Sequence, residues 1–304
     1  MNDMEMIKAL TLPEGKVDAV LDTDAYNEID DQFAIAYMLR SDEKINVREI
    51  YAAPFYNDKS TGPADGMEKS YEEIKHILTL LKRADMIEKT YRGSCNYLQD
   101  EFTPVESEAA NALINLSKEY NAEKRLYVVA IGAITNVASA LIADPTIKDR
   151  IVVVWLGGHA LNWYDTREFN MYQDVAAARV VFGCGVPLVQ LPCMGVVSAF
   201  SVTAPELDYY LKGKNALCDY LVENTVEYQG GRGRFWSKTI WDVTAVGWLL
   251  NENCRFMHEL LVRAPVPEYD DRYAYRADSH FMKYVPYINR DALMKDLFDK
   301  LTRN

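Results

Sequence analysis

The stretch Val17-Asp-Ala-Val-Leu-Asp-Thr-Asp-Ala-Tyr-Asn-Glu-Ile-Asp-Asp31 joins an apolar segment to a dense group of acidic residues. The apolar segment is typical of a strand, and Phe33–Leu39, which follows the acids, is typical of the body of a helix. The carboxylates therefore lie on a loop between a strand and a helix, where open α/β sheets place their ligand sites. They are Asp22, Asp24, Glu28, Asp30 and Asp31.

Carboxylates held this close together repel one another unless a cation or raised pKa values compensate. Calcium and magnesium ions bind carboxylate oxygens, so a hard divalent cation is a simple solution. The alternative is structural: Asp30 and Asp31 would cap the helix, and Asp22 and Asp24 would be ordinary turn residues. Both pairs at one strand-to-helix junction favour metal or phosphate chemistry.

The composition describes a globular chain with an acidic surface. Hydrophobic residues make up 49% of the 304 residues, and the net charge of −12 argues against a nucleic-acid partner or an anionic membrane. No apolar run is long enough to cross a membrane, and the beginning lacks the features of a signal peptide. Five scattered cysteines are typical of reduced thiols. We expect a cytoplasmic protein with a single domain over residues 1–304.

Short β-rich runs alternate with helical patterns, which predicts an α/β fold: an open, mostly parallel, Rossmann-like sheet wrapped by helices. Strands are expected at Val17–Asp22, Val47–Ala53, Leu126–Ile131, Ile151–Leu156 and Pro187–Leu191. Helices are expected at Asp30–Arg40, Met67–Lys82, Ser107–Tyr120, Ile134–Ile142 and Val175–Phe182. After about residue 200 the pattern becomes helical, at Ala204–Lys212, Ala216–Gln229 and Thr239–Asn251, with a few irregular strands between Ala264 and Tyr287.

Four loops that follow predicted strands should converge at one edge of this sheet. Besides the acidic loop, Ala53–Asp58 offers Asn57, and Ile131–Asn136 contains a glycine that lets a backbone carbonyl face a site. The loop after Leu156 carries groups that suit the hydroxyls of a sugar, namely Asn162, Glu168 and Asn170. A further acid, Asp242, lies in an apolar segment, where an unpaired carboxylate would be costly.

Taken in order, these motifs resemble the inosine–uridine-preferring nucleoside hydrolase family over about residues 17–250. The matching residues are Asp22, Asp24, Asp30 and Asp31; Ile131-Gly-Ala-Ile-Thr-Asn136; Gly157-Gly158, Asn162, Glu168-Phe-Asn170 and Asp174; and Trp241-Asp242. Each motif alone is weak, and the resemblance depends on their order and number.

The resemblance implies hydrolysis of the N-glycosidic bond of a ribonucleoside, or a related N-riboside, to ribose and free base. It implies a calcium ion held by Asp24, Asp31, the Ile131 carbonyl and Asp242, with Asp24 also acting as the base toward a metal-bound water. Asp30 would accept a ribose hydroxyl. The remaining sugar contacts would come from Asn162, Glu168 and Asn170. The family also implies a homodimer or homotetramer.

The chain departs from the family in two places. Asp24 and Asp30 are six positions apart, two more than in the family motif, so Asn27 and Glu28 should lie near the sugar or the metal. In an alternative alignment, Glu28 takes the place of Asp30. Trp241 replaces the family histidine thought to protonate the departing base.

The lost histidine affects recognition of the leaving group. Trp241 is able to stack on a purine ring, which is worth roughly 1–3 kcal/mol by analogy with base–aromatic stacking, or simply to pack its helix. A purine or another self-activating leaving group would suit a site without the histidine. His159 is a candidate replacement for the acid, although loop histidines are more often surface residues. Arg232 and Arg234 are candidate pocket residues.

Two other functions remain open at this point. A magnesium-dependent phosphohydrolase of the haloacid dehalogenase type also carries Asp-x-Asp after its first strand, with the first aspartate as nucleophile. Tyr26 and the Glu168-Phe-Asn170 segment do not fit that class. The second alternative is a non-catalytic protein that binds ribose or nucleosides.

Overall fold

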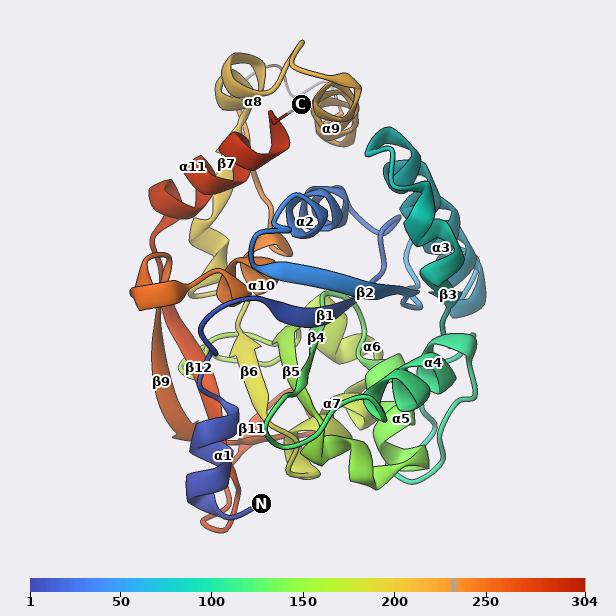
Figure 1. Ribbon diagram of the computed structural model, residues 1–304, viewed down its shortest axis with the longest axis vertical. Helices are drawn as coiled ribbons and strands as arrows, with labels where there is room; N and C mark the ends of the chain where they lie inside the picture. The colour runs from blue at the N-terminus through green and yellow to red at the C-terminus, as the bar shows by residue number, and fades with distance from the viewer. Residues whose placement is uncertain (231–232, 234, 304) are drawn as a thin grey trace.

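The computed structural model describes residues 1–230, 233 and 235–303, and a sheet of eight strands crosses the molecule (Figure 1). The strands lie in the order β3-β2-β1-β4-β5-β6-β12-β9. All neighbours pair in parallel except β12 and β9, which are antiparallel. The bounds are β1 Val17–Thr23, β2 Ile45–Ala52, β3 Thr90–Arg92, β4 Leu126–Ala130, β5 Ile151–Leu156, β6 Leu188–Leu191, β9 Met257–Arg263 and β12 Phe281–Ile288.

The strand order reverses beside β1. The chain proceeds from β1 outward to β2 and β3, and then returns to the other side of β1 to form β4. The loops that follow β1 and β4 therefore leave the sheet in different directions and open a crevice between them. The acidic loop, Asp24–Ile29, lies at this point.

Helices cover both faces of the sheet (Figure 1). Successive strand residues join opposite cores: Leu21, Val129 and Val154 pack on one face, whereas neighbouring residues such as Val20 pack on the other. This burial on both faces explains the nearly continuous apolar strands. The first face carries α2 Asp30–Leu39, α3 Pro63–Leu80, α10 Val243–Leu249 and α11 Arg290–Leu301; the second carries α4 Glu108–Ser117, α5 Thr135–Ala143 and α7 Val175–Gly183.

The predicted fold class is confirmed, but the C-terminal part is less helical than expected. Helices α8 Ala204–Tyr210 and α9 Ala216–Tyr228 are present, yet β12 and β9 extend the central sheet after them. The irregular strands expected between residues 264 and 287 include β10 Val266–Pro267 and β11 Tyr273–Ala274. None of the described helices has both the length and the apolar character needed to cross a membrane. The single-domain expectation stays a prediction.

The helix expected at Thr239–Asn251 is too long. Residues Ser237–Thr239 form β8, which pairs with β7, Ser201–Thr203, and α10 begins only at Val243. The pairing of β8 with a distant segment is a tertiary interaction, and such interactions override local helical periodicity. The short helix α6, Phe169–Gln173, and strand β3 were not predicted.

Asn136, at the start of α5, connects the carboxyl ends of neighbouring strands. Its Nδ2 donates to Asp22 Oδ1 (2.7 Å) and to the Ala52 carbonyl (3.2 Å). Its Oδ1 accepts from the backbone N–H (2.7 Å) and hydroxyl (2.9 Å) of Ser94. The Asp22 carboxyl beneath it is fully buried, and burial raises its pKa to about 7. This one amide therefore satisfies groups from β1, β2 and the loop after β3.

We expect Asn136→Ala to lower the free energy of unfolding by about 3 kcal/mol or more, because each buried polar group left without a partner costs about 1–3 kcal/mol. Urea denaturation measures this change. Asn111→Ala is the matched control, since Asn111 is an exposed residue of α4, and its effect should stay within about 0.5 kcal/mol. Equal effects of the two substitutions would contradict the connecting role of Asn136.

Candidate active site

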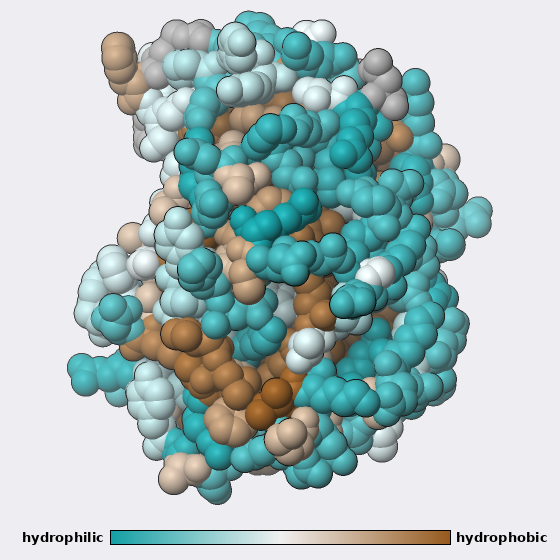
Figure 2. All heavy atoms as spheres, turned by 60° about the vertical axis from the view of Figure 1, so that its left-hand side comes forward, coloured by the Kyte–Doolittle hydropathy of each residue, from teal (hydrophilic) through white to brown (hydrophobic). Residues whose placement is uncertain are grey.

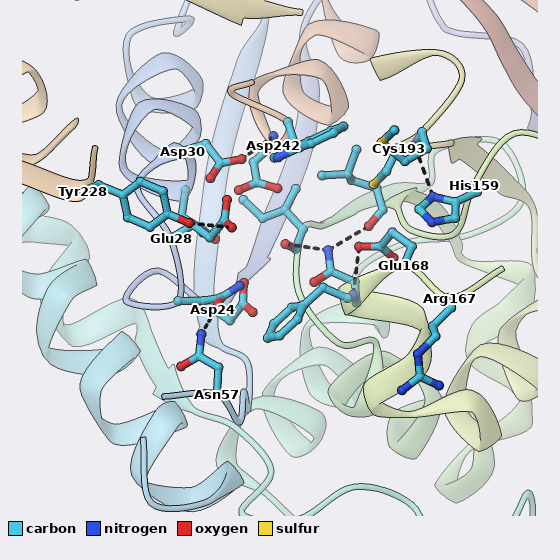
Figure 3. A pocket seen from close by; sticks show the side chains of 18 of the residues that line it. Asp24, Glu28, Asp30, Asn57, His159, Arg167, Glu168, Cys193, Tyr228 and Asp242 are labelled. Carbon is cyan, nitrogen blue, oxygen red and sulfur yellow. Dashed lines mark hydrogen bonds between the residues drawn. The ribbon is translucent and has the colours of Figure 1, made fainter. Parts of the chain in front are cut away.

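A cavity of about 400 Å³ opens at the carboxyl ends of β1, β4 and β5, beside the loops that follow them (Figure 3). The acidic loop after β1 and Asp242 lie on one side, and Glu168, His159 and Cys193 lie on the other. Every predicted site residue except Asn162 lines this cavity: Asp24, Glu28, Asp30, Asp31, Asn57, Ile131, His159, Glu168, Asn170, Trp241 and Asp242. Asn162 is exposed and lies outside this group.

Four buried aspartates gather at the floor of the cavity. Asp30, Asp31 and Asp242 place carboxylate oxygens within 4.8 Å of one another. Both oxygens of Asp24 are buried, and neither accepts a hydrogen bond from any described residue. Burial, together with the charge of Asp30, raises the pKa of Asp31 to about 7. Burial and the charges of Asp31 and Asp30 likewise hold the pKa of Asp24 well above its ordinary value.

This arrangement fits a hard divalent cation. The available donors are all oxygens, and the unpartnered Asp24 carboxylate is the kind of group that a metal ion satisfies. Ile131 lines the same cavity, and its carbonyl accepts from Asn170 Nδ2 at 3.1 Å, which leaves that oxygen a second lone pair. The aspartate cluster is therefore able to bind a metal ion. Asp30 belongs to the close group as well, although the family resemblance assigns it to the sugar.

Glu168 has a structural task at the cavity wall. Its carboxylate accepts from the backbone N–H groups of Gly158 (2.8 Å), Asn170 (2.8 Å) and Met171 (3.0 Å), and so caps α6. Burial raises its pKa to about 7 even though these N–H groups favour the charged form. Asn170 donates through Nδ2 to the carbonyls of Ile131 and Leu156 (3.0 Å), which leaves its Oδ1 as an acceptor for a hydroxyl group.

The two extra residues of the acidic loop are held by polar contacts. Asn27 Oδ1 accepts from Asn57 Nδ2 at 2.7 Å. Glu28 accepts from the Tyr228 hydroxyl at 3.0 Å and from the Lys238 ammonium group, which also lies 4.0 Å from Asp30 Oδ1. These carboxylates raise the pKa of Lys238 despite its burial. Glu28 is therefore paired outside the aspartate cluster, whereas Asp30 is within it.

His159 is buried beside the cavity and is not the surface residue that its loop position favours. Its Nδ1 accepts from the backbone N–H of Met194 at 3.2 Å, and its Nε2 lies 3.7 Å from Asp165. Burial lowers the pKa of the imidazole, and the Asp165 charge only partly offsets this effect. The neutral form with its proton on Nε2 is consistent with both contacts.

Sequence reasoning missed several residues of the site. Lys238 lies on the unpredicted strand β8, and Tyr228 ends a helix that showed no site motif. Cys193 and Arg167 also line the cavity. Of these four residues, only Arg167 could have been suspected from the sequence, because it directly precedes the Glu168 motif. Arg232 and Arg234 lie outside the described residues.

The comparisons with known proteins agree with this geometry. The family model described as inosine-uridine preferring nucleoside hydrolase matches residues 19–271. A pyrimidine-specific ribonucleoside hydrolase, RihA, of Escherichia coli is 27% identical over 183 residues, which cover 53% of this chain and 55% of that protein. A probable uridine nucleosidase 2 of Arabidopsis thaliana is 30% identical over 148 residues, which cover 47% of this chain and 45% of the Arabidopsis protein. The chain thus spans about half the length of these curated relatives.

Solved structures match over nearly the whole chain. A purine-preferring ribonucleoside hydrolase from Gardnerella vaginalis has a TM-score of 0.76 at 20% identity and covers 94% of this chain and 98% of that one. A plant nucleoside hydrolase, PpNRh1, has a TM-score of 0.74 at 17% identity, with 95% and 99% covered. At these identities the structures support the fold, and the family model adds the sequence match. The chain therefore belongs to the inosine–uridine-preferring nucleoside hydrolase family.

Proposed function

We propose that the chain hydrolyses the N-glycosidic bond of a ribonucleoside or related N-riboside, giving ribose and a free base, in a calcium-dependent reaction. The observation that carries this proposal is the buried Asp24 carboxylate, which has no described hydrogen-bond partner and lines a cavity together with amide and carboxylate side chains. The names of the relatives, ribonucleoside hydrolases and a uridine nucleosidase, support the same chemistry.

In this proposal Asp24, Asp31, the Ile131 carbonyl and Asp242 hold the calcium ion. The ion, when bound, supplies positive charge that offsets the carboxylates and lowers the pKa of a water molecule. Asp24 accepts the proton of the attacking water, a role that suits a carboxylate whose pKa is raised by burial and neighbouring charge. Asp30 and Asn170 Oδ1 accept sugar hydroxyls and so orient the ribose.

The two alternative functions meet different difficulties. In a phosphohydrolase, Asp22 would be the nucleophile, yet it is fully buried, bonded to Asn136 and absent from the cavity lining. A non-catalytic nucleoside-binding protein would need no activated water, so the base candidate Asp24 beside a full set of metal-ligand candidates argues against it. The cytoplasmic location and the homodimer or homotetramer stay predictions.

The direct test is an assay of reducing sugar, with purified protein, calcium and a panel of purine, pyrimidine and pyridine ribosides. Release of ribose from at least one of them supports the proposal. Release of phosphate from simple phosphomonoesters with magnesium, without any release of ribose, would favour the phosphohydrolase instead.

We expect Asp24→Asn to lower kcat by at least about 100-fold, because a positioned base contributes about 10²–10⁴-fold. The fold should persist, as measured by circular dichroism, since the substitution removes a buried charge and keeps the shape. Asp278→Asn is the matched control, because Asp278 is exposed and pairs only with Arg276 among the described residues. Turnover by Asp24→Asn at the rate of the control would remove Asp24 from the proposed role.

A further prediction concerns calcium and pH together. The folded-state pKa of Asp31 is about 7, above its unfolded value, so the folded state holds this proton more tightly. The resulting stabilisation is fully present below about pH 4 and is lost as the pH rises through about 7. With a chelator present, the melting temperature should therefore decrease as the pH is raised from about 5 to about 8. Calcium should raise it more at about pH 8, where the ligands are deprotonated.

Thermal denaturation with and without calcium at both pH values measures this effect. Asp31→Asn should abolish the shift caused by calcium and, in chelator at about pH 8, raise the melting temperature, because one repelling charge is gone. Asp278→Asn should behave like the unsubstituted protein. A calcium shift of the same size at both pH values, or one that survives in Asp31→Asn, would contradict the proposed ligand set.

A further inference from the structure

The cavity contains a base for the water but lacks a ready acid for the leaving group. When the C1′–N bond breaks, its electron pair goes to the ring nitrogen, so a neutral heterocycle departs as an anion unless it receives a proton. Trp241 occupies the position where the family carries the histidine proposed to donate that proton, and an indole N–H is not acidic enough to replace it.

The other groups that line the described part of the cavity do not replace this acid. Burial raises the pKa of Glu168 to about 7, but both of its oxygens already accept hydrogen bonds from backbone N–H groups, which holds it as an acceptor. The imidazole of His159 is neutral in the arrangement described above, because its Nδ1 accepts a backbone N–H and burial lowers its pKa. The Tyr228 hydroxyl already donates to Glu28, and burial raises its pKa to about 12. Burial also holds the pKa of the Cys193 thiol well above its ordinary value. The Arg167 guanidinium group does not release its proton in proteins.

The charge of the lining is strongly negative. Arg167 is the cationic side chain among the described residues that line the cavity, and it already pairs with Asp271 at 3.1 Å. Lys238 lies behind Glu28 and neutralises that one group. A divalent cation would offset two more charges and leave the cavity acidic, which favours a positively charged ligand over a neutral one. The acidic side chains in the lining are Asp24, Glu28, Asp30, Asp31, Asp58, Glu168 and Asp242.

Trp241 supplies a third feature that suits a cation. Its indole is only partly buried and lines the cavity, directly beside the metal-binding candidate Asp242 in the chain. The face of a tryptophan ring is the best aromatic surface for a cation, and it also stacks on flat heterocycles. A flat cationic ring would use both properties at once.

Resting on the proposed N-riboside hydrolysis, we propose that this site prefers ribosides whose leaving heterocycle carries a formal positive charge, of the N-ribosylpyridinium kind. The C1′–N bond breaks, and its electron pair neutralises the ring nitrogen, which departs without needing a proton. The oxygen of water adds to C1′, and Asp24 takes the proton of that water and passes it to solvent. The products are ribose, a neutral heterocycle and one proton, so charge and atoms balance.

The test compares N-ribosylnicotinamide, a permanent cation, with the neutral substrate inosine, using the full chain loaded with calcium. We expect kcat/KM to be at least about 100-fold higher for the cation, since an absent general acid costs neutral substrates about 10²–10⁴-fold. Trp241→His restores a donor and should raise kcat/KM for inosine at least about tenfold, with little change for the cation. Phe102→His is the control, because that side chain is 84% exposed and lies outside the cavity lining.

Binding provides a second measurement that does not depend on how Trp241→His folds. The calcium-loaded, unsubstituted protein should bind the carbocyclic analogue of N-ribosylnicotinamide, which is not hydrolysed, at least about tenfold more tightly than the uncharged dihydro form of that analogue, which has nearly the same shape. Tighter binding of the cation, together with its faster hydrolysis, supports the proposal.

The contrary outcomes separate this proposal from the one on which it rests. Similar kcat/KM values for both substrates, equal binding of the charged and uncharged forms, or an inosine rate that Trp241→His does not raise would each overturn the preference for a cation. These results would leave N-riboside hydrolysis in place. Failure to release ribose from any riboside, with calcium bound, would overturn both.

Discussion

The repulsion between carboxylates buried at the end of β1 constrains the rest of the structure. Asp24, Asp30, Asp31 and Asp242 come from two segments more than 200 positions apart, yet they share one floor. Folding must bring these charges together, and it does so against their mutual repulsion and the cost of burial. The apolar layers on both faces of the sheet provide the driving force, and a cation in the cavity would relieve the remaining strain.

The same constraint separates two kinds of acid in the loop. Glu28 has a lysine and a tyrosine as partners, so its charge is compensated by the protein itself. Asp24 has no described hydrogen-bond partner, so its charge is left for a bound cation to compensate. Although Glu28 and Asp24 are both acidic and close in sequence, the carboxylate without a described partner is the one whose charge is left for a ligand to compensate.

Much of the fold and part of the site followed from the sequence for physical reasons. The strands β1, β4 and β5 are buried on both faces, so their sequences are apolar runs. The loops that follow them carry polar residues, which are costly to bury in an apolar core and therefore mark a site.

Lys238 could not be predicted, because it reaches Glu28 only through the pairing of β7 with β8, a contact between distant segments. Asn162 matched a motif, but a motif does not fix the direction of a loop side chain. Strand β9 was not predicted, and β12 lies largely within the range where only a few irregular strands were expected, because an edge pair exposed on one side lacks the continuous apolar pattern. Figure 2 shows an apolar area on that side of the molecule, and exposed Leu260, Leu261 and Tyr287 belong to these strands.

The two ends of the acidic loop are held more firmly than its middle. Asp22 is bonded to Asn136 at one end, and α2, in which every residue is buried, begins at the other. The extra length between these anchors lies at the wall of the cavity, where Asn27 meets Asn57 and Glu28 meets Tyr228 and Lys238. A change of length in the middle of this loop would therefore reshape the wall of the cavity without moving Asp30 and Asp31, which the buried helix α2 holds in place.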